Sequence, residues 1–116
     1  MIKMPLADKA TVPAEKILVY LLNLQSKDGR GKAIFFRRHG FYEGNWPFLA
    51  EQLIELAQRE PVFATRINRF GGANHEIRGV IVSPQGRLLE VKSIWFFKVG
   101  MLGPRLVTAF KLEDDL

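Results

Sequence analysis

The chain has 116 residues, which is enough for one domain with a modest core. It is 47% hydrophobic and 25% charged, a composition typical of a globular fold and too apolar for a disordered chain. The absence of cysteine excludes disulfide frameworks, thiol nucleophiles and thiolate zinc sites, and two histidines are too few for a multi-histidine metal centre. We therefore expect no metal and no other cofactor. With 17 basic and 12 acidic residues the net charge is +5, which favours acidic partners, nucleic acid first.

Nothing in the sequence indicates a membrane protein. The longest apolar run is too short to span a bilayer, and the first residues lack the apolar core of a signal peptide. We therefore expect a cytoplasmic protein with no membrane partner.

Three helices are predicted in the first half of the chain, each from apolar residues that recur at helical spacing. Pro13 opens the first, because proline at the first helical position lacks only a donor that would be unpaired there anyway. The second spans about 32–39, and Gly40 follows it in a left-handed cap. The third spans about 46–59 behind a capping Asn45.

After Pro61 the apolar residues alternate with polar ones, which is typical of strands with one buried face. The connections between the apolar runs are short, and they force neighbouring strands to run antiparallel, because a parallel return needs a crossover of about a dozen residues. The four predicted strands are 62–70, 76–83, 88–98 and 105–111.

The predicted fold is a single α+β domain over residues 1–116, in which three N-terminal helices are followed by a four-stranded antiparallel sheet in meander order. We expect the helices to pack on one face of the sheet, and residues 1–10 and 112–116 to be frayed. Seven apolar side chains are expected in the core: Leu18, Leu21, Phe35, Leu53, Val91, Trp95 and Val107.

The densest group of charges lies in the loop and helix at residues 27–38. Cations beside the free amides of a helix N-terminus form a pattern that binds phosphate, although a solvated loop and helix face has the same composition. Lys32 is the most informative residue of the group, because a lysine in the first helical turn faces the positive end of the helix dipole unless an anion shares that end. The predicted phosphate- or RNA-binding residues of this segment are Arg30, Lys32, Arg37 and Arg38.

The two histidines are the side chains best suited to act as a general base near neutral pH. His39 ends the second predicted helix, where it can also cap a terminal carbonyl, and His75 stands beside the turn at residues 71–72. Each is a candidate for proton transfer, and each position also suits the more ordinary role of a capping or loop-edge residue.

Three segments of the sequence are distinctive: KILVYLLN at 16–23, GRGKAIFF at 29–36 and PRLVTAF at 104–110. They resemble a bacterial family of unknown function, whose members occur alone or as C-terminal domains of larger, in some cases toxin-like, proteins. The resemblance extends over residues 5–111. Its order of helices and strands is similar to that of metal-independent ribonucleases of the barnase, colicin and RelE type.

The resemblance implies four functional polar positions: Lys32, Trp95, Arg105 and Thr108. In a ribonuclease-like site Lys32 and Arg105 would bind phosphate, Thr108 would orient the substrate, and His39 or His75 would transfer a proton. Arg105 and Thr108 are three positions apart, so in a regular strand they point to opposite faces. Both can line one cleft only if Arg105 precedes the regular strand or a bulge intervenes.

Two classes of function are compatible with these residues. The family often has a histidine three residues after Asn23, where this chain has Ser26, and a proline where it has Leu24. If that histidine transfers the proton in active relatives, this chain lacks it. This favours a non-catalytic module that binds RNA or a protein partner such as a cognate immunity or antitoxin protein. The alternative is a metal-independent ribonuclease-type toxin domain in which His39 or His75 takes over.

Overall fold

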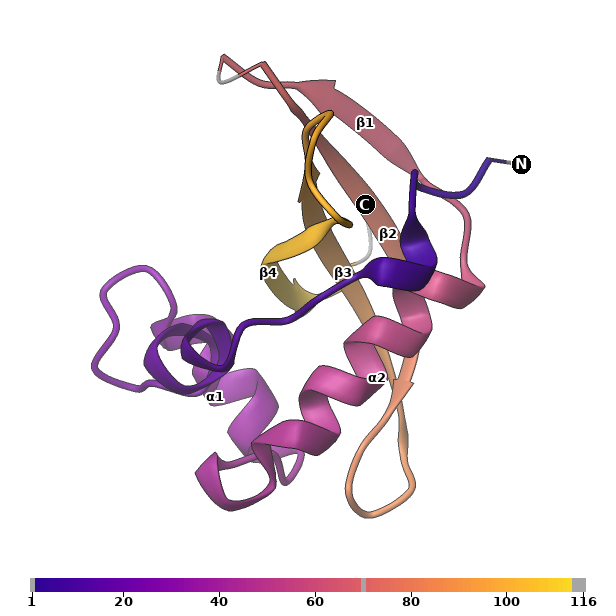
Figure 1. Ribbon diagram of the computed structural model, residues 1–116. Helices are drawn as coiled ribbons and strands as arrows, with labels where there is room; N and C mark the ends of the chain where they lie inside the picture. Colours follow the sequence, from indigo (N-terminus) through magenta and orange to yellow (C-terminus); the bar gives the residue numbers. More distant parts are fainter. Residues whose placement is uncertain (1, 70, 114–116) are drawn as a thin grey trace.

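The computed structural model describes residues 2–69 and 71–113 (Figure 1), so the predicted tail beyond residue 113 lies outside the described residues. The helical segments are η1 (Ala7–Lys9), η2 (Lys16–Leu21), α1 (Arg30–Arg38), η3 (Glu43–Asn45) and α2 (Trp46–Arg59). The strands are β1 (Ala64–Ile67), β2 (Ala73–Val82), β3 (Leu88–Phe97) and β4 (Arg105–Lys111). Helices therefore precede strands, which confirms the α+β prediction.

The four strands form one antiparallel meander in the order β1-β2-β3-β4, as predicted. The longest pairing joins β2 and β3, whose partners run from Ala73 opposite Phe97 to Val82 opposite Leu88. β1 is shorter than the predicted strand 62–70, whose last residue lies outside the described residues.

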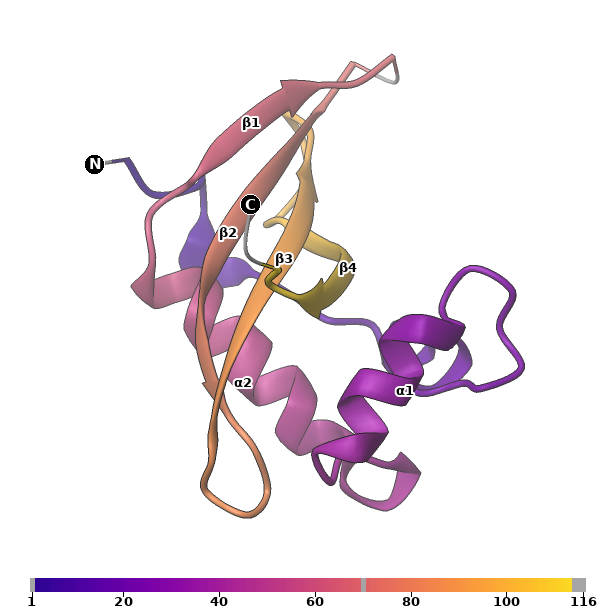
Figure 2. The ribbon, with the colours of Figure 1, turned by 180° about the vertical axis from the view of Figure 1, so that it is seen from behind.

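The two faces of the sheet are covered differently. α2 crosses one face against β2, so it lies in front of the strands in Figure 1 and behind them in Figure 2. Leu53 and Leu56 of α2 are fully buried, as are Ile77 and Trp95 of the sheet. α1 and η2 contact β4 at the edge. In β2 and β3, the side chains that alternate with these buried ones point to the opposite face of the sheet, and none of them is buried. We call this the open face.

The first predicted helix contains a π-helical segment, which shifts its buried side. The Leu22 N–H donates to the Ile17 carbonyl at 2.8 Å, an i to i+5 hydrogen bond that widens the turn. The wider turn buries Ile17, Leu21 and Leu22, while the predicted core residue Leu18 is only half buried. Here the prediction from an α-helical period was wrong by one position.

Four of the seven predicted core residues are buried: Leu21, Leu53, Val91 and Trp95. Besides Leu18, the exceptions are Phe35 and Val107, which are partly exposed because the neighbouring Phe36 and Leu106 occupy the core positions instead.

The N-terminal segment packs onto the domain. Met4, Ala7 and Ala10 are buried in the core, and Thr11 forms a parallel bridge with Arg105 of β4. The described part of residues 1–10 thus contributes three side chains to the core.

The connection from α1 to α2 depends on Gly40 and Asn45. Gly40 has φ +94°, and the Phe41 N–H donates to the Phe36 carbonyl at 3.1 Å, which confirms the predicted left-handed cap. Asn45 directly precedes α2 but makes no side-chain cap. Its Oδ1 accepts from the Tyr42 N–H at 2.8 Å and its Nδ2 donates to the Gly40 carbonyl at 3.0 Å. Asn45 therefore fixes the turn before the helix instead of the helix end.

Candidate functional site

A β-bulge in β4 places Arg105 and Thr108 on the same face of the sheet. Leu106 and Thr108 pair with consecutive residues of β3, so Val107 between them is an extra residue in the strand. Leu106 is buried, whereas Arg105 is exposed and Thr108 is partly exposed. The bulge thus brings two of the four polar positions named by the resemblance to the open face.

Tyr20 of η2 lies where three segments meet. Its hydroxyl accepts a hydrogen bond from Lys32 Nζ of α1 at 2.5 Å and shares another with Thr108 Oγ1 of β4 at 3.1 Å. The ammonium groups of Lys16 and Lys32 lie 5.2 Å and 5.0 Å from the centre of the Tyr20 ring. We call Lys16, Tyr20, Lys32 and Thr108 the Tyr20 cluster.

The surroundings of Tyr20 shift its acidity. Burial on its own would raise the pKa of Tyr20, but the hydrogen bonds from Lys32 and Thr108 and the charges of Lys32 and Lys16 outweigh it. The pKa of Tyr20 is therefore held below its usual value of 10.0. Within the described part of the chain, Lys32 forms no ion pair with a carboxylate, and its charge acts on the Tyr20 hydroxyl and on the rings of Tyr20 and Phe110.

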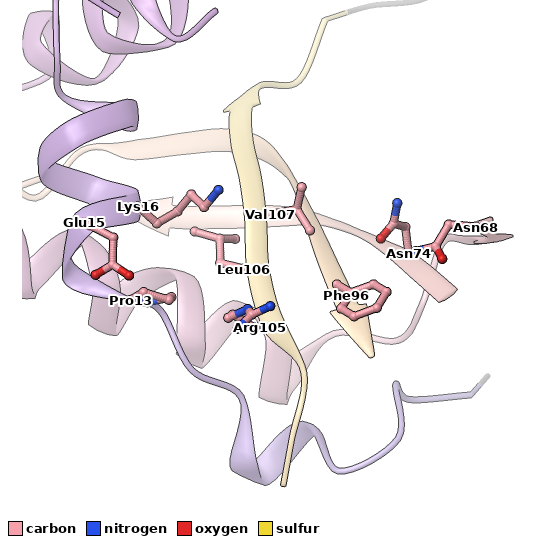
Figure 3. A pocket seen from close by; sticks show the side chains of 9 residues that line it. All are labelled: Pro13, Glu15, Lys16, Asn68, Asn74, Phe96, Arg105, Leu106 and Val107. Atoms are coloured by element: carbon pink, nitrogen blue, oxygen red, sulfur yellow. The ribbon is translucent and has the colours of Figure 1, made fainter. Parts of the chain in front are cut away.

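A pocket of about 660 Å³ opens beside the cluster, between η2 and the sheet (Figure 3). Lys16 lies on the η2 wall and its side chain extends toward β4, where Arg105 is exposed. Phe96 of β3 lies further across the sheet, with Asn74 beyond it. The pocket therefore presents two cations, an aromatic ring and two amides, and the carboxylate of Glu15 lies on the same wall as Lys16.

A second, smaller pocket of about 240 Å³ lies in the middle of the open face. Its one acid, Glu76, pairs with Arg78 at 2.5 Å and with Lys92 at 3.9 Å. The Lys92 ammonium also lies 5.3 Å from the centre of the Phe110 ring. The residues that line this pocket are Ala64, Arg66, Asn74, Glu76, Lys92, Ile94 and Phe110.

The other predicted cations of α1 lie apart from Lys32. Arg37 is engaged within the fold, because it donates to the Leu22 carbonyl at 2.7 Å and pairs with Glu43. Arg30 and Arg38 are exposed, and the helical period places both on the side of α1 away from Lys32. The structure therefore brings together Lys32 and Thr108, with Arg105 nearby, and leaves the other three arginines elsewhere.

Neither histidine lies in the Tyr20 cluster. His75 is buried on the face of β2 opposite to the open face, and its Nδ1 shares a hydrogen bond of 2.9 Å with Thr65 Oγ1. His39 follows the last turn of α1, about 10 Å along the axis from Lys32, and lines a different pocket with Phe35.

His75 is expected to make the stability of the domain depend on pH. Burial lowers its pKa below 6.5, so the unfolded chain takes up this proton more readily than the folded one. The free energy of unfolding should fall as the pH drops below about 6.5 and level off below the lowered pKa. Urea unfolding of the wild type, His75→Gln and His39→Gln across this range checks the prediction. Only His75→Gln should flatten the dependence, and an equal flattening by His39→Gln would contradict it.

Tyr20 was not singled out from the sequence, in which it is one of several apolar and aromatic residues of the first predicted helix. Its position in KILVYLLN, among the segments that resemble the family, was the available signal. Ser26 lies close to it: Ser26 Oγ accepts from the Gly29 N–H at 3.1 Å, and a Cβ at Gly29 would lie 2.5 Å from the Tyr20 carbonyl oxygen. The loop in which the resemblance places a histidine in relatives therefore adjoins Tyr20.

Residues 3–113 match a family described as "Domain of unknown function (DUF6883)". The chain belongs to this family. The expected membership of a family of unknown function is thus confirmed, while the relation to ribonucleases stays a prediction. A search among curated proteins found no match for this DUF6883 domain.

The fold of the DUF6883 domain is similar to that of a chain in the contact-dependent growth inhibition toxin–immunity protein complex from Klebsiella pneumoniae 342. The TM-score is 0.69, the match covers 93% of this chain and 97% of that chain, and the sequence identity is 16%. This likeness concerns the fold alone.

Among the described residues, no helix of the DUF6883 domain is long and apolar enough to cross a membrane. The same residues contain no group of three or more histidine, aspartate or glutamate side chains placed to hold a metal ion.

Proposed function

We propose that this DUF6883 domain is a toxin-related module that binds single-stranded RNA along the open face, with the Tyr20 cluster as a phosphate site. The observation that carries the proposal is the cluster itself. Two lysines and two hydroxyl groups from three separate segments converge at the edge of a face that also bears Arg105 and Lys92. Converging cations and hydroxyl donors are what a phosphodiester requires.

Partly exposed aromatic rings on the open face favour single-stranded RNA over other polyanions as the ligand. Phe96 and Phe110 point to the open face between the cations and are partly exposed. Unpaired bases stack on such rings whatever their sequence, while the cations follow the backbone.

The comparison with solved structures supports the toxin-related setting. A chain of a toxin–immunity protein complex has the same fold. We propose a cognate immunity or antitoxin protein as the second partner of this domain.

Removing two cations from the open face is expected to weaken RNA binding. In Lys32→Ala/Arg105→Ala the dissociation constant for a fluorescent single-stranded RNA of about 12 nucleotides should rise at least about tenfold. Its salt slope should fall by about 1.4, because each phosphate contact on a single strand contributes about 0.7. Fluorescence anisotropy over a salt series measures both quantities, and a thermal melt shows whether each variant is folded.

The matched control is Arg87→Ala/Lys98→Ala, which removes the same charge, one arginine and one lysine, from exposed positions outside the open-face pockets. It should bind RNA almost as the wild type does. Equal weakening in both double variants would mean that only net charge attracts RNA. No binding by the wild type would leave a protein partner as the function of the face.

A further inference from the structure

We infer that Tyr20 is a catalytic residue, the general base of a metal-independent RNA cleavage on the open face. This inference rests on the proposed function, because it concerns the reaction of RNA bound at the same site. It assigns the chemistry to a residue other than the two histidines.

The groups around the Tyr20 hydroxyl favour its phenolate form. Lys32 Nζ donates to the oxygen at 2.5 Å, and Thr108 Oγ1 lies at 3.1 Å, where it can donate as well. The Lys16 ammonium lies 5.2 Å from the ring centre. Two donors at the oxygen and two positive charges around the ring all favour the ionised form over the neutral phenol.

Every charged group that acts strongly on Tyr20 has the same sign. Lys16 comes from its own helix and Lys32 from α1, while β4 contributes the neutral Thr108. Asp28 and Glu113 line the neighbouring pocket with Lys32 but do not pair with it. The lowered pKa of Tyr20 agrees with this arrangement.

Tyr20 is also accessible to RNA. Its side chain is only partly buried, and Lys16 on the same helix lines the pocket that leads to Arg105. A phosphate held between Lys16 and Arg105 would place the adjoining ribose near the edge at which Thr108 and Tyr20 meet. By contrast, His75 is on the opposite face and His39 is about 10 Å along α1 from Lys32.

The reaction is a transesterification within the RNA backbone. The Tyr20 phenolate takes the proton of a ribose 2′-hydroxyl, and the 2′-oxygen forms a bond to the adjacent phosphorus. The bond from phosphorus to the 5′-oxygen of the next nucleotide breaks, and that oxygen takes a proton from water. The resulting hydroxide removes the proton from Tyr20, which restores the phenolate. The products are a 2′,3′-cyclic phosphate and a 5′-hydroxyl, and Lys32 stabilises the charge that develops on the phosphate.

The test compares Tyr20→Phe with Tyr42→Phe, since the chain has two tyrosines and Tyr42 is exposed on a separate turn. Total bacterial RNA is incubated with each protein in excess EDTA, and the 2′,3′-cyclic phosphate ends are counted. The wild type and Tyr42→Phe should cleave the RNA, and Tyr20→Phe should be at least about 100-fold slower. Anisotropy with the fluorescent RNA should give the wild type and Tyr42→Phe the same dissociation constant. Tyr20→Phe should bind at most about tenfold more weakly, because it lacks one hydroxyl of the phosphate site, so its loss of cleavage rate should far exceed its loss of binding.

A pH profile separates a catalytic role from a structural one. A base must be deprotonated, so the cleavage rate of the wild type should rise with pH and level off at the pKa of Tyr20, below 10.0. Tyr20→Phe should lose this rise. Wild-type binding without cleavage at any pH would overturn the inference and leave the proposed function intact. Cleavage by Tyr20→Phe at the wild-type rate would also overturn it, and absence of binding would overturn both.

Discussion

Replacing Trp95 by alanine is expected to lower the free energy of unfolding by about 3–5 kcal/mol. Trp95 is fully buried near the end of β3, where it pairs with Leu106 of the bulged strand β4. Its Nε1–H donates to Ser93 Oγ at 2.9 Å, and Ser93 Oγ donates to the Ile77 carbonyl at 3.0 Å. The alanine variant therefore loses a large apolar contact surface, leaves a cavity, and removes the donor at the head of this buried hydrogen-bond chain.

Urea unfolding followed by far-ultraviolet circular dichroism measures this loss. The control is Trp46→Ala at the start of α2, which should cost clearly less because Trp46 is only partly buried. Trp95→Phe should fall between the wild type and Trp95→Ala, since it keeps most of the apolar volume but lacks the N–H donor and part of the ring system. An equal loss for both alanine variants would show that Trp95 is not central to the core.

Gly103→Ala is expected to lower the free energy of unfolding by about 1–3 kcal/mol. Gly103 is buried in the connection between β3 and β4, against the N-terminal segment. A Cβ at this position would overlap the backbone oxygen of Lys9 and lie 2.7 Å from its carbonyl carbon. The Lys9 backbone cannot rotate away from the new methyl group as a side chain can, so the N-terminal segment must shift. The nearby bridge between Thr11 and Arg105 should weaken with it.

Thermal melts give the stability change, and hydrogen exchange at the Leu106 amide reports on the bridge, because that amide donates to the Thr11 carbonyl at 3.0 Å. Gly31→Ala is the matched control. A Cβ there meets nothing within 4 Å and the position is helical, so this change should stabilise the domain by about 0.5–1 kcal/mol. If Gly103→Ala also stabilises the domain, the close approach of Gly103 to Lys9 does not constrain the N-terminal segment.

The sheet was largely predictable because the features that specify it lie close together in the sequence. Alternating apolar residues and short turns fix both the face and the direction of each strand, and β4 was predicted at the bounds it has, Arg105–Lys111. Gly40 was likewise predictable as a helix cap, since few residues tolerate a positive φ.

The departures have causes outside the local pattern. A π-turn and an α-turn differ too little over six residues for the apolar pattern to separate them, so Leu18 was predicted in the core where Ile17 is buried instead. The bulge at Val107 depends on how β4 pairs with β3, and the sequence left both possibilities open.

The candidate site was predictable only in part for the same reason. Lys32 was predicted from its place in the first turn of a helix after a loop. Arg105 and Thr108 were predicted from the family resemblance. Tyr20 was missed because its partners come from elsewhere in the chain, and at residue 20 a tyrosine fits an apolar helix face equally well. Its hydrogen bond with Thr108 joins positions 88 residues apart.

That separation has a consequence during translation. The helices that carry Tyr20 and Lys32 leave the ribosome long before the strand that carries Thr108, and domains are completed as their last elements emerge. Until then Tyr20 has no hydroxyl partner on β4, and the bridge that closes the N-terminal segment onto Arg105 cannot form. A nascent chain that ends before β4 therefore lacks these contacts even when its helices are formed, and the Tyr20 cluster is assembled only after residues 105–111 have left the ribosome.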